Sequence, residues 1–367
     1  MRRTRDTALL GGFLVLLAGL LNTAPLYVPG VTLVLIALVC EGWVRAAQHE
    51  IVVERELERP RVVEDQAVHA DIVVRAGIGF PAGHLADPFL GGVLVPLDTG
   101  RRLQRLRVRA EFARRGLRTF APATVEVRDP LGMASRTVVR GVPFQLLVLP
   151  KIEPLQAAGA LGRESASSLL RGLASAAGAD VDGLRRHRPG APASRIYWQG
   201  LARGGELFER RVSHGNDGRA LIVLDARNAS QDDLDAAVRA AASVTAHFGA
   251  RVGCHLALPG RRRALSVGPA LRRWEAAHGE LARVEHGGRP APELIAAQQG
   301  LLILVSGART PDLMLLTERR GRGPCIVVVP GPVPAPHKAA FTVSGCSAYL
   351  LRARLPATSR AAGRAAP

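Results

Sequence analysis

The residues best suited to chemistry lie between Gly178 and Arg210. Six arginines cluster there around Tyr197, Trp198 and Phe208, namely Arg185, Arg186, Arg188, Arg195, Arg203 and Arg210. A guanidinium can stack on an aromatic ring and can bind a carboxylate or phosphate through two hydrogen bonds. Two interpretations stay open. Either the arginines pair with acids of the same stretch and fasten the loop to its own domain, or they form a surface that docks a partner.

The order of residues in this stretch resembles the domain of unknown function 58 family. The matching segments are Asp182-Gly183-Leu184-Arg185, Pro189-Gly190, Arg195-Ile196-Tyr197-Trp198, Ala202-Arg203 and Leu207-Phe208-Glu209-Arg210. The resemblance implies a membrane-anchored protein with a von Willebrand A-like domain and a MoxR-type AAA+ ATPase as partner, and it implies no established reaction. It also implies the binding residues, which would be Asp182, Gly183, Arg185, Pro189, Gly190, Arg195, Trp198, Ala202 and Arg203. Two positions depart from the family pattern, because Ala191 replaces an aspartate and His187 replaces a tyrosine.

A second candidate site follows the apolar run Arg219–Asp225. In metal-binding von Willebrand A domains the equivalent strand ends in Asp-x-Ser-x-Ser, whose oxygens hold a divalent cation, and hard cations need oxygen ligands. Here the chain has Asp225, Arg227 and Ala229 at those three positions, so both hydroxyls are lost. A guanidinium beside Asp225 would take the place of the cation. We therefore expect a degenerate site with no metal and no cofactor.

Motifs typical of enzymes are absent from the sequence. It contains no Ser/His/Asp order, no His-Glu-x-x-His, no Walker lysine motif and no nucleophile elbow. The first hypothesis is therefore a non-enzymatic, membrane-anchored interaction or scaffold protein. The alternative is a membrane-associated hydrolase or transferase, for which no nucleophile can be named.

The charge of the chain invites a third hypothesis, which is nucleic-acid binding. The formal net charge is +18 and the isoelectric point is about 11.3. However, only Lys151 and Lys338 are lysines, and aromatic residues make up 4% of the chain, which leaves few rings for base stacking. A basic surface facing anionic lipids explains the same charge. We expect a lipid bilayer and no nucleic acid as a partner.

Two apolar runs near the N-terminus predict a transmembrane hairpin over residues 1–46. The runs are Ala8–Leu21 and Leu26–Cys40, and they are separated by Asn22-Thr23-Ala24-Pro25. A single helix through both would be about 50 Å long, against a hydrocarbon core of about 30 Å. Arginines flank both outer ends and the turn is uncharged, so the positive-inside rule predicts a two-pass inner-membrane protein with cytoplasmic soluble domains. A cleaved signal peptide ending near Ala24 is the competing interpretation.

The next segment, residues 47–150, has the period-two pattern of a β-sandwich. Strands are expected at Ile51–Val53, Val68–Val74, Leu103–Ala110, Val125–Val127 and Phe144–Val148. Within Leu103–Ala110, the apolar residues should face the core and Arg105, Arg107 and Arg109 should face solvent. Asp129-Pro130 is interpreted as a turn. An alanine- and glycine-rich linker is expected over residues 151–177, with its helical state left open.

Residues 178–355 are expected to form the family signature and an α/β domain, followed by a disordered tail over residues 356–367. Apolar strands at Val252–Leu258, Leu301–Val305 and Cys325–Val329 follow Arg219–Asp225 and alternate with helical stretches. Such alternation is typical of a doubly wound parallel sheet covered on both faces. Ser230 and Asp233 predict a capped helix N-terminus. The predicted fold class is thus α+β with a membrane hairpin, a β-sandwich and a von Willebrand A-like domain.

Overall fold

The computed structural model describes residues 2–77, 79–80, 82–157, 184–186, 208–210, 219–298, 300–312, 314–317, 323–331 and 339–351. The chain divides into two units. The first comprises Met1–Ala113 and Leu117–Val148, and the second comprises Arg114–Gly116 and Leu149–Pro367.

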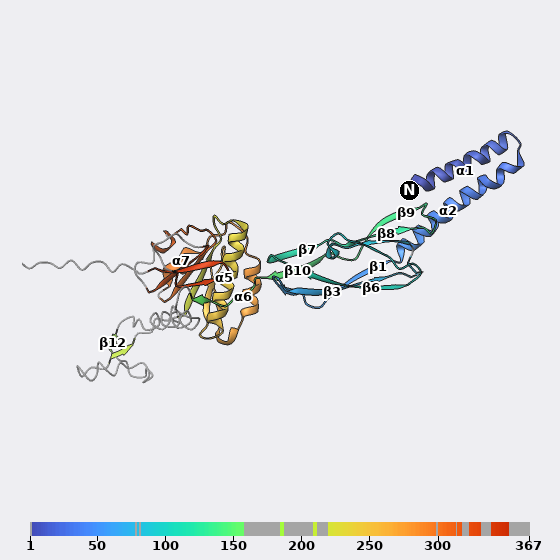
Figure 1. Ribbon diagram of the computed structural model, residues 1–367. Coiled ribbons are helices and arrows are strands. Elements are labelled where there is room, and N and C mark those ends of the chain that lie inside the picture. The colour runs from blue at the N-terminus through green and yellow to red at the C-terminus, as the bar shows by residue number, and fades with distance from the viewer. Residues whose placement is uncertain are drawn as a thin grey trace, which may run out of the picture. The chain divides into compact units, whose positions relative to one another are not determined.

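The first unit begins with two helices that lie side by side (Figure 1). They are α1 (Arg2–Leu20) and α2 (Tyr27–His49), joined by a 3-10 turn, η1 (Ala24–Leu26). Glycines allow the close approach, since a Cβ added at Gly11 would lie 2.7 Å from the Gly30 carbonyl oxygen. Small residues at such a contact are typical of helices that pack inside membranes.

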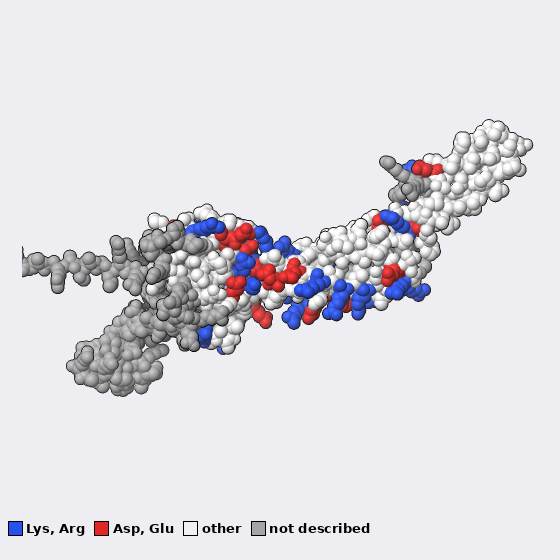
Figure 2. All heavy atoms as spheres, in the orientation of Figure 1, with Lys and Arg blue, Asp and Glu red and all other residues white. Residues whose placement is uncertain are grey.

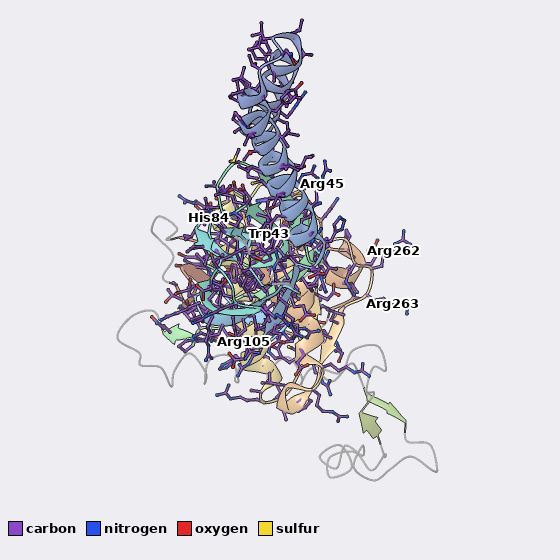
Figure 3. The ribbon with its side chains drawn as sticks, turned by 90° about the vertical axis from the view of Figure 1, so that its right-hand side faces the viewer. Trp43, Arg45, His84, Arg105, Arg262 and Arg263 are labelled. Carbon is purple, nitrogen blue, oxygen red and sulfur yellow. The ribbon has the colours of Figure 1, made fainter. Side chains whose placement is uncertain are left out.

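One helical segment in the described part of the chain, Ala24–His49, is long and apolar enough to cross a membrane. The first two turns of α1 carry four charged residues, Arg2, Arg3, Arg5 and Asp6. The last turns of α2 pass into the core of the β-rich strands, where Cys40, Val44 and Ala47 are buried. Figure 3 shows Trp43 and Arg45 on this part of α2. The helix α2 and the β-rich strands therefore share one core.

Three sheets complete the first unit. Their strand orders are β1-β3-β6, β2-β10-β7 and β5-β4-β8-β9. The strands are β1 (Val52–Leu57), β2 (Arg61–Val63), β3 (Ala67–Arg75), β4 (Ala82–Ala86), β5 (Leu94–Pro96), β6 (Leu103–Glu111), β7 (Gly116–Phe120), β8 (Ala123–Arg128), β9 (Ser135–Arg140) and β10 (Phe144–Leu149), with η2 (Pro88–Leu90) between β4 and β5. The five strands expected from the period-two pattern are all confirmed, and the additional strands lie between them.

One hydrophobic core joins these sheets. Ile72, Val125 and Leu146 come from three different sheets and are fully buried in it. The alternation predicted for β6 is confirmed, because Leu106, Val108 and Ala110 pack against the core while the arginines between them are exposed.

Asp129 shows why the Asp-Pro sequence makes a turn. The Gly132 amide donates to the Asp129 carbonyl over 3.0 Å, which closes a β-turn. The carboxylate accepts from the Leu131 amide at 3.0 Å and from the Ala134 amide at 2.6 Å. Burial alone would raise the pKa of Asp129, but hydrogen bonds from the Ala134 amide, the Cys40 thiol and the Leu131 amide outweigh it and lower the pKa. The predicted turn is confirmed.

We expect Asp129→Asn to destabilise the first unit by about 1.5 kcal/mol at neutral pH, because a neutral amide accepts these hydrogen bonds less well than a carboxylate. Since folding lowers the pKa of Asp129, its contribution is present above the unfolded-state pKa of about 4 and is lost as the pH falls further. Thermal unfolding of the detergent-solubilised chain at pH 7 and pH 3 checks this. The destabilisation by the variant should shrink at pH 3, and an equal deficit at both pH values would contradict it.

The second unit is built on one mixed sheet with the order β11-β19-β20-β18-β17-β14-β15-β16. The central strands β14 (Ala220–Asp225), β15 (Cys254–Ala257), β17 (Leu302–Ser306) and β18 (Cys325–Pro330) are parallel. The outer strands β11 (Gln156–Ala157), β16 (Leu265–Val267), β19 (Phe341–Val343) and β20 (Cys346–Leu351) pair antiparallel. The short β12 (Leu184–Arg186) and β13 (Phe208–Arg210) form a separate antiparallel pair.

Helices cover both faces of this sheet. On one face, α5 (Gln231–Gly249) and α6 (Trp274–Ala282) pack over Ile222 and Ile303. On the other face, residues of α7 (Pro292–Ala297) and α8 (Met314–Thr317) pack over Val223 and Leu304. Consecutive apolar residues of β14, β17 and β18 thus point alternately into two different cores, which explains why these strands are almost entirely apolar.

Two sequence-based expectations need correction here. The sheet is not purely parallel, because β19 and β20 form a hairpin whose turn residues, Ser344 and Gly345, both have positive φ. Residues with positive φ at both central positions of a two-residue turn favour a β-hairpin, so Ser344-Gly345 was an overlooked signal. The start of the expected linker is also part of the fold, because Gln156–Ala157 is the edge strand β11 and Leu155 is buried, while residues 158–177 lie outside the described ranges.

The four cysteines, Cys40, Cys254, Cys325 and Cys346, are free and buried. Burial raises the pKa of Cys254 to about 12 and that of Cys346 to about 12. At neutral pH both therefore remain thiols, which are poor nucleophiles and poor metal ligands.

Candidate functional site

The candidate site lies at the carboxyl ends of β14 and β17. Asp225 ends β14 and is paired in register with Ser306, which ends β17. The chain leaves β14 for β15 on one side and later returns to β17 on the other side, so the order of strands reverses between β14 and β17. In open α/β sheets, ligands bind beyond the carboxyl ends of the strands at such a reversal. The position of Asp225 was predicted from the sequence, and the fold brings Ser306 beside it.

The guanidinium of Arg227 occupies the space in front of the Asp225 carboxylate. Arg227 Nε lies 3.0 Å from Asp225 Oδ1, and one terminal nitrogen lies 2.9 Å from Oδ2. The Arg227 amide also donates to Oδ1 at 3.2 Å. The Asp225 side chain is only 4% exposed, and that of Arg227 is 25% exposed. Hydrogen bonding to Asp225 raises the pKa of Arg227 despite its partial burial, so the guanidinium is a fixed positive charge.

Arg227 also reaches a second acid. The terminal nitrogen that contacts Asp225 lies 3.2 Å from Asp312 Oδ2, and Asp312 accepts from the Met314 amide at the start of α8. Asp312 precedes α8 by two residues, so the sequence alone gave no reason to associate it with β14. The guanidinium thus bridges the two carboxylates.

The loop after β14 leads directly into α5. Ser230 caps this helix, because its hydroxyl accepts from the Asp233 amide at 3.2 Å, as the sequence predicted. Arg309, which follows β17, lies 3.3 Å from the Asp233 carboxylate and is largely exposed. A second ion pair therefore borders the site.

Close backbone packing holds the two strand ends together. The Gly307 amide donates to the Asp225 carbonyl over 2.8 Å. A Cβ added at Gly307 would lie 2.8 Å from the Ala229 Cβ, so position 229 touches the neighbouring strand rather than open space. The small residues at 229 and 307 explain how the strand ends approach so closely.

This arrangement is an ion-pair network at the edge of a sheet. Within the described part of the chain, no group of three or more His, Cys, Asp or Glu side chains is placed to hold a metal ion. Asp225, Arg227 and Ala229 lie together as expected, and the absence of metal binding stays a prediction. Chemically, the exposed Asp312, Arg309 and the outer side of Arg227 can form ion pairs with a partner.

The residues of the family signature fall almost entirely outside the described ranges. Arg185 is the exception, because the backbone of β12 places it opposite Glu209 of β13. Within this stretch, the described residues form the antiparallel pair β12 and β13. The others are Asp182, Gly183, Pro189, Gly190, Arg195, Trp198, Ala202 and Arg203, and their roles stay predictions.

Sequence reasoning also missed a buried ion pair in the second unit. Arg115 Nε lies 3.0 Å from Asp235 Oδ1, and both side chains are at most 5% exposed. Arg115 also donates to the carbonyls of Leu281 and Val284 at the end of α6, at 3.2 and 2.8 Å. Asp235 lies on the buried face of α5, and an acid on an apolar helix face was the available signal.

Comparison with known proteins adds little to this description. No family model matches the chain, and no curated protein matches it. Among solved structures, it is similar to the CARDB domain of a Pyrococcus furiosus protein in complex with di-metal ions, at 15% identity and a TM-score of 0.20. That similarity covers 27% of this chain and 88% of the other. The account of function therefore rests on the residues of this chain.

Proposed function

We propose that this chain is a non-enzymatic, membrane-anchored interaction protein of the domain of unknown function 58 type. Its N-terminal helices would form a two-pass anchor, and its second unit would be a von Willebrand A-like module that docks a MoxR-type AAA+ ATPase. The observation that carries the proposal is the apolar helix Ala24–His49, whose last turns are built into the core of the β-rich strands.

Several contacts support an anchor that crosses the membrane twice. The Thr4 hydroxyl at the start of α1 donates to the Met133 carbonyl at 2.8 Å, and Arg136 lies 2.8 Å from Glu41 of α2. The polar start of α1 thus contacts the connection between β8 and β9, and the polar part of α2 contacts β9 itself. The exposed side chains between them are apolar, including Phe13, Leu16, Val31 and Leu35. A bilayer would cover that surface.

The second unit supports the von Willebrand A-like assignment at the level of architecture. It has parallel strands with helices on both faces, which is the class of fold to which that domain belongs. Its Asp225 lies at the reversal of strand order, and Arg227 supplies the positive charge there. The ion pairs around Asp312 and Arg309 would then form the docking surface for the ATPase.

A reporter fusion tests the topology. A reporter that is active only outside the cytoplasm, fused after Pro367, should give no signal, because arginines flank both outer ends of the hairpin and its turn is uncharged. A reporter active in the cytoplasm should give full signal at the same position. A strong external signal would contradict the two-pass anchor and would favour a single span or a cleaved leader.

A further inference from the structure

The strand β6 forms one edge of the sheet β1-β3-β6. It is nine residues long and pairs with β3 along its whole length, from Leu103 opposite Arg75 to Glu111 opposite Ala67. No backbone hydrogen bond in the described part of the chain joins its other edge to another segment. That edge can therefore accept a further strand.

The hydrogen-bond register shows which residues face this open edge. Just beyond the two ends of the β3–β6 ladder, the Ala76 amide donates to the Arg102 carbonyl, and the Asp65 amide donates to the Phe112 carbonyl. Even-numbered residues of β6 therefore direct their backbone groups toward β3. Because these directions alternate along a strand, Arg105, Arg107 and Arg109 direct their backbone amides and carbonyls toward the open edge.

The side chains of the same three residues point to solvent. Arg105, Arg107 and Arg109 are exposed, while the residues between them face the core. Among the described residues, none of the three forms an ion pair or a side-chain hydrogen bond. Alternate residues of a strand are about 7 Å apart, so the row extends for about 14 Å. Figure 2 shows basic side chains in a row along the β-rich part, on the side where Figure 1 places β6.

We propose that the open edge of β6 binds an extended polypeptide segment that carries acidic residues at alternate positions. Such a segment would add as a new strand to β6 through the backbone groups of Arg105, Arg107 and Arg109. Its acidic side chains would lie beside the three guanidiniums on the same face. Strand addition of this kind takes affinity from backbone hydrogen bonds and specificity from alternate side chains. The proposal does not depend on the ATPase partner proposed above.

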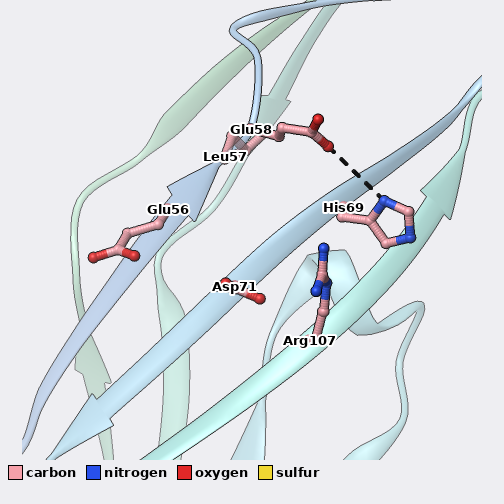
Figure 4. A pocket seen from close by; sticks show the side chains of 6 residues that line it. All are labelled: Glu56, Leu57, Glu58, His69, Asp71 and Arg107. Carbon is pink, nitrogen blue, oxygen red and sulfur yellow. Dashed lines mark ion pairs between the residues drawn. The ribbon is translucent and has the colours of Figure 1, made fainter.

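The rest of the sheet restricts where an acidic segment can bind. On the same face, Glu56, Glu58 and Asp71 line a depression of about 270 Å³ that Arg107 borders (Figure 4). His69 lies 3.9 Å from Glu58 there. These acids would repel an acidic segment from the face over β1 and β3. At β6 the positive row and the open backbone groups coincide.

Other occupants fit this edge less well. In a second copy paired through β6, arginine would lie opposite arginine, and like charges directly opposite each other are destabilising. An anionic lipid surface or a nucleic acid would be attracted to the three guanidiniums but would make no use of the backbone groups between them. A polypeptide strand uses both features.

The test uses the full chain in detergent micelles and a fluorescein-labelled peptide in which glutamate and threonine alternate. Fluorescence anisotropy should show saturable binding, and a peptide with its glutamates in one block should bind more weakly. Replacing Arg107 with alanine should weaken binding about two- to fivefold, the range for one cross-strand charge pair. The matched control is Arg262→Ala, which removes another exposed arginine, in the second unit (Figure 3), and should leave binding unchanged.

The backbone contribution is tested by Arg107→Pro. Proline is tolerated on an edge strand where the lost amide faces solvent, so β3–β6 pairing should persist. Binding should fall about tenfold further than in Arg107→Ala, because one backbone hydrogen bond is lost and the ring blocks the edge. If Arg107→Pro does not fold, a peptide N-methylated on the amides that face β6 gives the same test on the wild-type protein.

Three results would overturn the proposal. The first is absence of saturable binding of the alternating peptide to the wild-type chain. The second is a binding that does not depend on the backbone, seen as equal affinity of Arg107→Pro and Arg107→Ala, or as equal affinity of the methylated and unmethylated peptides, when the wild-type chain also retains anionic vesicles or single-stranded DNA comparably well. The third is dimerisation of the wild-type chain that Arg107→Pro abolishes, because the edge would then bind a second copy.

Discussion

Replacing Arg115 with alanine is expected to lower the free energy of unfolding of the second unit by about 3–5 kcal/mol, because breaking a buried pair leaves an uncompensated charge. Asp235 would lose its cationic partner in an environment where its side chain is 5% exposed. The carbonyls of Leu281 and Val284, at the end of α6, would lose their donor at the same time. Hydrogen exchange measured on peptides from α5 and α6 should report the loss locally, since a chain of two units need not unfold in one step.

Two variants control for this effect. Arg114 pairs with Asp232 at the surface, so Arg114→Ala should change stability by less than about 0.5 kcal/mol. Replacing the buried pair together, as Arg115→Met with Asp235→Leu, should restore much of the stability, because apolar residues of similar volume remove both charges. Equal, small effects of Arg114→Ala and Arg115→Ala would show that the buried pair contributes little.

The second large effect is expected at the carboxyl edge of the sheet. Arg227→Ala should destabilise the second unit by about 2–3 kcal/mol, somewhat less than for a fully buried pair because Arg227 is partly exposed. Asp225 would keep a single backbone amide as donor among the contacts described here. The comparison variant is Arg309→Ala, whose exposed pair with Asp233 should contribute less than about 1 kcal/mol. Denaturant unfolding, together with hydrogen exchange measured on β14 and β17, should show a larger loss of stability for Arg227→Ala than for Arg309→Ala.

The same geometry predicts how the protein responds to metal ions. Magnesium or manganese should leave the Tm of the wild-type chain unchanged, because Arg227 already neutralises Asp225 and contacts Asp312. A specific ligand present at about 100 times its Kd would stabilise the fold by about 2.7 kcal/mol. A saturable rise in Tm with either ion would show that the guanidinium does not exclude the cation.

The sequence predicted secondary structure well wherever hydrophobic residues followed a clear pattern. The alternation in Leu103–Ala110 and the apolar runs of the parallel strands follow from one-sided and two-sided burial, which local sequence encodes. β20 was missed because its pattern is weaker and its turn, Ser344-Gly345, was not recognised. The charged residues around the site could be predicted only in part. Asp225 and Arg227 are neighbours in sequence, whereas Arg115–Asp235 and Arg227–Asp312 join residues 120 and 85 positions apart.

The structure also changes how the protein must be studied. Cys40, Val44 and Ala47 belong to the core of the β-rich strands. A fragment that begins at Glu50 would expose part of that core, and its behaviour would not represent the first unit. Experiments on partners therefore need the full chain.

The most direct test of the proposed function is binding between the full chain in nanodiscs and the purified MoxR-type ATPase of the same organism, measured by biolayer interferometry. We predict saturable binding that Asp312→Arg weakens at least tenfold, because that change reverses an exposed charge beside Arg227 without removing the Arg227–Asp225 pair. Arg262→Ala should bind like the wild-type chain, since this exposed residue lies outside the ion-pair network. Absence of saturable binding by the wild-type chain would contradict the proposed function.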